Sequence, residues 1–226
     1  MKRFLVTILT MTSFTVFGQE EVVFNTMDSI GQRNGSWVIR YENDKPKLVE
    51  NFEHGKRHGV SLSFFNNGMI HFEKYFKFDV LHGTQRTYDN VGRLIKEENL
   101  SEGVLHGVQI SYYPKGKKQE ESNYADGVKD GPALWYFENG DTAAVYHYVE
   151  GKIEGQVKSF YVGGKLKSIT NFKNNEQVGD YAAYYEDGSM REKGQFIAGK
   201  KHGKFYFYDE KGKVLKTERY KNGEKK

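Results

Sequence analysis

The chain has 226 residues, with 25 glycines, three prolines and no cysteine, and 15% of its residues are aromatic. Charged residues reach 28%, but their signs nearly balance at a net charge of +4, which excludes a polyelectrolyte tail and gives no electrostatic case for nucleic-acid binding. The lack of cysteine excludes disulfide bonds and cysteine-ligated zinc.

Residues 1–18 have the pattern of a cleavable signal peptide. Lys2 and Arg3 give a basic start, and residues 4–17 are all apolar, Thr or Ser. This stretch is shorter than the roughly 20 residues that a membrane-spanning helix needs. Val16 and Gly18 stand where signal peptidase requires small residues, so we expect cleavage near Gly18 and export to the periplasm, cell envelope or medium. The alternatives are a membrane anchor or a buried N-terminal helix.

From residue 35 onward the sequence repeats every 24 residues. Eight glycines mark the period, at Gly35, Gly59, Gly83, Gly107, Gly131, Gly155, Gly179 and Gly203. Residues 35–226 are therefore predicted to form eight tandem units. Residues 19–34 are expected to form an N-terminal half-repeat or cap, because Gly31 falls in the register of a later glycine of the unit. Positions are counted below from each repeat glycine, so that Phe64 stands at plus five of its unit.

Each unit is predicted to form a β-hairpin. A second glycine recurs at plus nine, as in Asn66-Asn67-Gly68, and a third recurs at plus twenty. Glycine supplies the positive φ that hairpin turns need, and its regular spacing leaves no apolar period of 3.6 residues for a helix. The predicted fold is all-β: an elongated, single-layer antiparallel meander of about sixteen strands, on the order of 75 Å long at about 4.8 Å per strand.

Alternation of side chains then assigns residues to the two faces of the sheet. Positions plus three, plus five and plus seventeen are expected to line one face, with Leu62, Phe64 and Phe76 as examples. Position plus six must point the other way. It carries an aromatic row of Tyr41, Phe65, Tyr113, Phe137, Tyr161 and Tyr185. Stability is expected to come from many contacts between neighbouring strands and units.

The repeat resembles the MORN repeat (membrane occupation and recognition nexus). Residues 148–155 read Tyr-x-x-Gly-x-x-x-Gly, and a Gly-Lys-x-His-Gly segment followed by Tyr-Tyr-x-x-Gly-x-Leu is similar to the bacterial MORN-repeat variant. That variant fills the YwqK-like proteins, which are commonly labelled as antitoxin components of toxin–antitoxin systems. The resemblance covers residues 31–226 and implies a fold of β-hairpin repeats, whereas repeat type does not specify a ligand.

The sequence gives little support for metal binding or catalysis. Four histidines precede a repeat glycine, at His58, His82, His106 and His202. Neighbouring units lie about 10 Å apart, whereas ligand nitrogens must converge on one ion at about 2.0–2.1 Å, so a polar turn role fits this column better. The chain has no nucleophile elbow, phosphate loop or paired carboxylates. We therefore expect no enzyme activity, no cofactor and no metal site.

The plus-six aromatic row is the candidate binding surface, because aromatic rings supply contact area at low entropic cost. The alternative is that these rings only stabilise the sheet. We expect an exported, non-enzymatic scaffold that binds another protein in the cell envelope. An antitoxin or immunity protein that neutralises a specific toxin, or a glycan-binding module, would need the same kind of surface. A membrane-surface role lacks a basic cluster or amphipathic helix, and open sheet edges would permit self-association.

Overall fold

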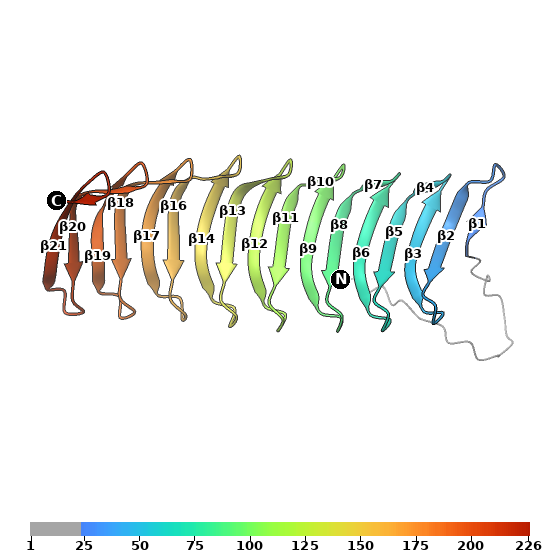
Figure 1. Cartoon of the computed structure of the whole chain (residues 1–226), viewed down its shortest axis with the longest axis horizontal. Coiled ribbons are helices and arrows are strands. Elements are labelled where there is room, and N and C mark those ends of the chain that lie inside the picture. The colour runs from blue at the N-terminus through green and yellow to red at the C-terminus, as the bar shows by residue number, and fades with distance from the viewer. Residues whose placement is uncertain (1–23) are drawn as a thin grey trace.

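The computed structural model describes residues 24–226, so the predicted signal peptide at residues 1–18 lies outside the described range. All 22 strands belong to one sheet. They form a single row from one end of the molecule to the other (Figure 1). Within residues 24–226, no helix is long and apolar enough to cross a membrane. The predicted all-β, single-layer fold is confirmed.

Sixteen of the strands have six to nine residues, two to each unit. They are β2 (Arg33–Arg40), β3 (Pro46–Glu53), β5 (Gly59–Phe64), β6 (Ile70–Lys77), β8 (Gly83–Tyr88), β9 (Leu94–Ser101), β11 (Gly107–Tyr112), β12 (Lys118–Ala125), β13 (Val128–Tyr136), β14 (Thr142–Val149), β16 (Gly155–Phe160), β17 (Leu166–Lys173), β18 (Glu176–Tyr184), β19 (Met190–Ile197), β20 (Lys200–Tyr208) and β21 (Val214–Lys221). The prediction of about sixteen strands holds for these long strands.

The other six strands have two residues each. They are β1 (Thr26–Met27), β4 (Lys56–Arg57), β7 (Val80–Leu81), β10 (Val104–Leu105), β15 (Lys152–Ile153) and β22 (Glu224–Lys225). Each long strand pairs antiparallel with its neighbours in the chain, as β6 does with β5 in its own unit and with β8 in the next. The described chain is therefore an up-and-down meander that adds one hairpin with every unit.

One end of each hairpin is a three-residue turn closed by the plus-nine residue. In the unit of Gly59, the amide of Gly68 donates to the carbonyl of Phe65 at 2.8 Å, and the amide of Phe65 donates to the carbonyl of Met69 at 2.8 Å. Gly68 has a φ of 94°. This is a type I turn followed by a left-handed residue, a common closure of three-residue hairpin loops. The predicted turn at Asn66-Asn67-Gly68 is confirmed.

The other end of each hairpin is a two-residue turn in which both central residues have positive φ. Asp126 and Gly127, for example, have φ values of 47° and 84°. This is the type I′ geometry, whose twist matches that of the flanking strands. The N-terminal half-repeat departs from it, because Gly31 closes a three-residue loop in which its amide donates to the carbonyl of Asp28 at 3.1 Å. Gly31 therefore shares the sequence register of the two-residue turns but not their geometry.

The repeat glycine lies in a bulge between neighbouring units. Phe52 pairs with Arg57, whereas Val49 pairs with Leu62, so two extra residues enter the second strand between these pairs. Gly59 lies in this interval with a φ of 91°, which explains why glycine is required there. An asparagine at plus sixteen spans the bulge: the Nδ2 of Asn51 donates to the carbonyl of Val60 at 2.8 Å. Asn99, Asn123 and Asn171 make the equivalent bond.

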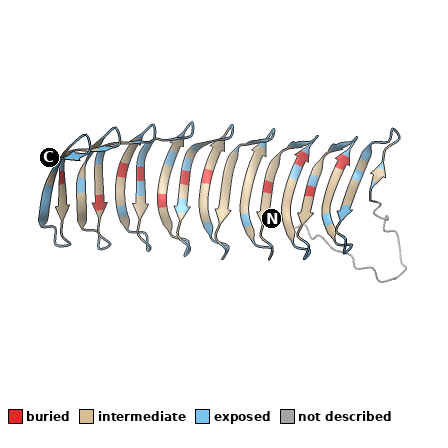
Figure 2. Cartoon of the chain, viewed as in Figure 1, coloured by how far each residue is buried: buried red, intermediate tan, exposed pale blue. Residues whose placement is uncertain are grey.

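All buried side chains of the described residues lie on one side of the sheet, here called the packed face. It consists of the repeat glycine and positions plus two, four, thirteen, fifteen and seventeen. The buried residues are Phe52, Ser61, Phe76, Gln85, Ser122, Ala133, Ala144, Val157, Thr170, Ala183 and Phe205. They are spread along the whole length of the sheet rather than gathered in one core (Figure 2).

The expected face of position plus seventeen was wrong. Gly59 pairs directly with Phe76, which places plus seventeen on the packed face together with plus two. Ring contacts agree, since Phe196 at plus seventeen meets Phe205 at plus two edge-on, with centroids 5.7 Å apart. The error arose because parity was counted along each strand separately. The three-residue turn and the adjacent bulge set the relation between the two strands of a hairpin, and neither could be counted from alternation alone.

Candidate functional site

The side of the sheet opposite the packed face, here called the open face, carries one continuous row of side chains. The row has one residue from each long strand, at plus three and plus fourteen, and each residue pairs directly with the next. In order it is Val38, Val49, Leu62, Glu73, Arg86, Glu97, Ile110, Glu121, Leu134, Val145, Lys158, Ile169, Ala182, Lys193, Tyr206 and Thr217. None of these residues is buried: thirteen are half-buried, and Lys158, Lys193 and Thr217 are exposed.

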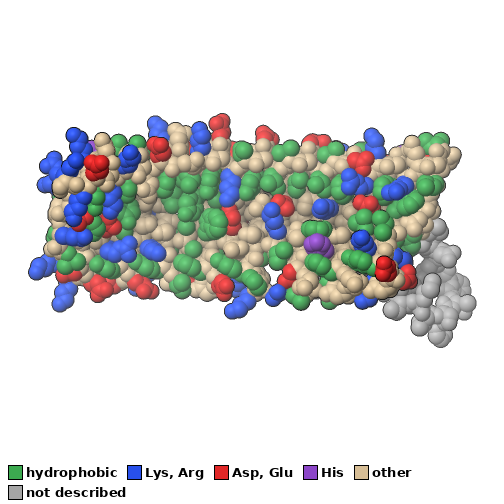
Figure 3. Space-filling view, in the orientation of Figure 1, with side chains coloured by type: hydrophobic (Ala, Val, Ile, Leu, Met, Phe, Trp, Pro, Cys, Tyr) green, Lys and Arg blue, Asp and Glu red, His purple; other side chains and the backbone are tan. Residues whose placement is uncertain are grey.

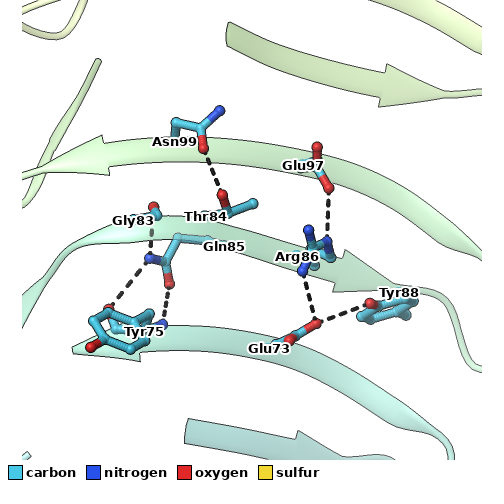
Figure 4. A network of polar contacts seen from close by, with 9 residues as sticks. All are labelled: Glu73, Tyr75, Gly83, Thr84, Gln85, Arg86, Tyr88, Glu97 and Asn99. Carbon is cyan, nitrogen blue, oxygen red and sulfur yellow. Dashed lines mark hydrogen bonds and ion pairs between the residues drawn. The ribbon is translucent and has the colours of Figure 1, made fainter. Parts of the chain in front are cut away.

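The fourth to sixth residues of this row, counted from the N-terminal end, form an ion network on β6, β8 and β9 (Figure 4). The Nε of Arg86 donates to Glu97 at 2.7 Å, and its Nη1 lies 3.4 Å from Glu73. The hydroxyl of Tyr88 donates to the same Glu73 carboxylate at 3.2 Å. Burial opposes the charge on Arg86, but the two carboxylates outweigh it and raise the pKa of the guanidinium. Burial, and then Glu73, raises the pKa of Tyr88. The charges of this segment therefore largely satisfy one another.

Two shallow grooves lie on the C-terminal half of the open face. The larger, of about 580 Å³, crosses β16 to β20 and is lined by Ile169, Asn171, Ala182, Met190, Lys193 and Tyr206, among others. Ala182 forms its low point, because the flanking Ile169 and Lys193 of the row carry longer side chains. The smaller groove, of about 390 Å³, is lined by Leu134, Thr142, Val145 and Phe160. Both grooves are open depressions rather than enclosed cavities.

The predicted plus-six aromatic row lies elsewhere, beside the three-residue turns. Its members, Tyr41, Phe65, Tyr113, Phe137, Tyr161 and Tyr185, are all half-buried. Phe65 stacks on His71, with centroids 4.2 Å apart, and His71 stacks in turn on Phe72 of the packed face. The ring of Phe65 therefore lies on the packed side at its hairpin end.

The tyrosine hydroxyls of this row bond to the next unit. The hydroxyl of Tyr185 donates to the carbonyl of Tyr208 at 2.7 Å, and that of Tyr161 donates to the carbonyl of Tyr184 at 2.8 Å. Tyr41 and Tyr113 make the same contact with the carbonyls of Phe64 and Tyr136. Each bond ties adjacent hairpins together near their turns, which is a structural role for the row.

The histidine column lies near the two-residue turns. The Nδ1 atoms of His58, His82 and His106 lie 3.7–3.8 Å from single carboxylates, and the ring of His58 packs against Phe78 with centroids 4.5 Å apart. Within residues 24–226, no group of three or more His, Asp or Glu side chains could hold a metal ion. His82 and His106 thus lie near a carboxylate of the following unit, and His58 packs against a ring of the following unit.

Comparison with known protein families agrees with this architecture. The MORN repeat variant matches residues 57–78, 105–126, 153–174 and 201–222. Four of the eight units match the MORN repeat variant. Each match starts just before a repeat glycine and ends within the two-residue turn, so the family repeat coincides with one hairpin of the structure. MORN repeats commonly mediate interactions with proteins or membranes. No curated protein matched the chain.

Sequence reasoning missed two features of these MORN repeats. The plus-sixteen asparagines that span the bulges recur at multiples of 24 residues, so periodicity could have singled them out. The groove at Ala182 had a weaker signal, since alanine stands at plus three in this unit alone. That this alanine forms the low point of a groove depends on the face it lies on and on its cross-strand neighbours. Both follow only from the strand register.

Proposed function

We propose that this protein is an exported, non-enzymatic scaffold that binds another protein in the cell envelope through its open face. The observation that carries the proposal is the contrast between the two faces. The packed face holds every buried side chain of the described residues, whereas the row on the open face has none. A surface that is ordered by backbone pairing but not covered by the chain itself is available to a partner.

The composition of the open face supports a protein as the partner. Its row alternates apolar segments, such as Val38 to Leu62 and Leu134 to Val145, with the ion network around Arg86. Apolar contact area interspersed with fixed charges is typical of protein interfaces. Charged positions along a long surface also fix how a partner is aligned on it, because an alignment that places like charges opposite one another is unfavourable.

Export rests on the sequence of residues 1–18 described above. If the signal is cleaved as proposed, N-terminal sequencing of the protein purified from its native cells will begin at Gln19, and the protein will be found outside the cytoplasm. An intact N-terminus starting at Met1, together with a cytoplasmic location, would refute this part of the proposal.

The binding face can be tested by capture from cell-envelope fractions with protein that starts at Gln19. In one variant Leu134 and Val145 are both changed to Glu, which places two charges in the smaller groove of the open face. In a second variant Tyr113, Phe137, Tyr161 and Tyr185 are changed to Ser, which alters the plus-six row instead. Circular dichroism must show that both variants keep their β-structure.

We expect quantitative mass spectrometry to identify a partner that the native protein and the plus-six variant retain and the open-face variant loses. If only the plus-six variant loses the partner, the binding site is the aromatic row. Retention by both folded variants would rule out the open face.

A further inference from the structure

We propose that the larger groove of the open face binds an extended, acidic peptide segment. This inference rests on the proposed function, in which the open face binds protein, and it specifies the chemistry of the partner. It is carried by three lysines, by the shape of the groove and by the cation–π contact of Tyr206, the aromatic residue on its open side.

Three lysines at or beside the groove have no acidic partner. Lys158, Lys193 and Lys204 are exposed, and none of them forms an ion pair with a carboxylate among residues 24–226. Lys193 and Lys204 line the groove, and Lys158 follows next to Ile169 in the open-face row. Asp180 is the one acidic side chain in the lining, and its Oδ1 accepts a hydrogen bond from Gln195 at 2.9 Å. The lining thus holds two lysines and one aspartate, an excess of one positive charge, and Lys158 adds a further cation beside it.

The same row contains a cation that is paired with carboxylates of this chain. Arg86, three units before the first unit of the groove, lies between Glu73 and Glu97, both on directly paired strands. The corresponding cross-strand neighbours of Lys193 are Ala182 and Tyr206, and those of Lys158 are Val145 and Ile169. Carboxylates supplied by a partner would therefore occupy, at Lys158 and Lys193, the place that Glu73 and Glu97 occupy at Arg86.

The groove has room for a main chain with small or apolar side chains. Its low point at Ala182 is flanked by the apolar Ile169 and Met190, and Asn171 and Gln195 stand along one side. The Nδ2 of Asn171 is already used by the carbonyl of Asp180 at 2.9 Å. The side-chain carbonyls of the two amides are left to accept hydrogen bonds from peptide N–H groups. Apolar contact at the low point with charge pairing on both sides suits an extended peptide.

A glycan fits the groove less well. Sugar rings bind by stacking on free aromatic faces, and the aromatic side chain on the open side of this groove is Tyr206. The Nζ of Lys193 lies over the ring of Tyr206, 5.4 Å from its centroid. This cation–π contact occupies the face that a sugar would need, and it holds the ammonium group above the groove.

The test uses the chain from Gln19 to Lys226 and a fluorescein-labelled peptide, Glu-Ser-Glu-Leu-Glu-Ser-Glu, with fluorescence anisotropy as the readout. The matched probe replaces every Glu by Gln. We expect the acidic peptide to bind at least tenfold more tightly than its neutral counterpart, and its affinity to fall as salt is raised. Equal binding of the two peptides would overturn the proposal.

Two charge-matched variants locate the site. The groove variant carries Lys158→Glu, Lys193→Glu and Lys204→Glu, and the control carries Lys211→Glu, Lys213→Glu and Lys221→Glu at the C-terminal end, where the lysines are exposed and the net charge changes equally. We expect the groove variant to lose at least tenfold in affinity and the control to lose less than threefold. The reverse result would place the acidic ligand at the C-terminal end and refute the groove.

A third probe, labelled oligogalacturonate, separates peptide from acidic glycan. If it binds as tightly as the acidic peptide and depends on the same three lysines, the groove reads charge alone and the peptide assignment fails. The two proposals fail separately. Partner capture that needs the open face, without binding of the acidic peptide, would leave the scaffold standing and refute this inference. Capture that ignores the open face would refute the scaffold's binding face, whatever the peptide does.

Discussion

Gly194 lies on the packed face and is the one glycine in residues 24–226 that does not have positive φ. A Cβ added there would lie 2.6 Å from three ring atoms of Phe205. That ring is fully buried and meets Phe196 and Tyr220 edge-on. An aromatic ring laid over a strand glycine compensates for the missing side chain. Glycine is therefore required at position 194 because the ring of Phe205 leaves no room for a Cβ, and not because of the backbone conformation.

Gly194→Ala is expected to destabilise the C-terminal units by about 1–3 kcal/mol, because the ring of Phe205 must move within a packed cluster. Urea unfolding and amide hydrogen exchange measure the effect, and exchange should rise in β18 to β21 while β2 to β6 keep their protection. In a Phe205→Ala background the same change should cost little, since the obstructing ring is gone. An equal cost in both backgrounds would contradict the role assigned to Phe205.

Single residues also show what could and could not be predicted at this scale. The glycines at plus nine and plus twenty were correctly assigned to turns, since they needed only a count of 24. The first residue of each two-residue turn was not recognised, because Phe78 and Ala198 occupy it with φ values of 50° and 47° that such residues rarely adopt. The twist that a type I′ turn shares with its strands outweighs the local preference of these residues.

At the scale of the strand, the assignment of faces was the weakest part of the sequence reasoning. Alternation along β5 and the residue that follows it separated plus five from plus six, but the relation between β5 and β6 depends on where the bulge falls, between Ser63 and Phe64. The prediction of the candidate site also lacked this relation between the strands. The plus-six row looked accessible by alternation, yet its hydroxyls reach 23 residues ahead to backbone carbonyls of the next unit.

One carboxylate links β22 to β21. Glu218 on β21 accepts bonds from Lys225 at 2.7 Å, Tyr220 at 2.6 Å and Lys216 at 3.1 Å. Lys225 of β22, then Tyr220 and Lys216, lower the pKa of Glu218 from 4.5 to about 2. A carboxylate with a lowered pKa in the folded state stabilises that state fully above its unfolded pKa, and the contribution disappears as pH falls through the folded pKa.

We therefore expect β22 to be held against β21 above pH 4.5 and to be released progressively toward pH 2. Carbon-13 NMR of the Glu218 carboxyl should report its pKa near 2, and amide exchange of β21 and β22 should rise over the same interval. Glu218→Gln should remove this local pH dependence while leaving β2 to β9 unchanged. A pKa close to 4.5 for Glu218 would show that the three contacts are not maintained in solution.

At the scale of the whole molecule, charge is unevenly distributed along the sheet. Residues 200–226 contain ten Lys or Arg and four Asp or Glu, a net charge of +6, whereas the whole chain has +4. Figure 3 shows basic side chains gathered at the C-terminal end, and an apolar band along the rest of the face in view. Lysines on an edge strand discourage pairing with another edge. The charge of β21 therefore works against the self-association that open edges would otherwise permit.

The meander also determines how the molecule would respond to tension. Its first and last strands stand at opposite ends of the sheet (Figure 1), so a pull between them acts along the interstrand hydrogen bonds. Interstrand hydrogen bonds loaded in this direction break one after another rather than all at once. With optical tweezers attached at residues 24 and 226, we expect low-force steps in which each unit releases about 80 Å of chain. A single abrupt rupture at high force would contradict this expectation, in which the protein extends at low force, one unit at a time.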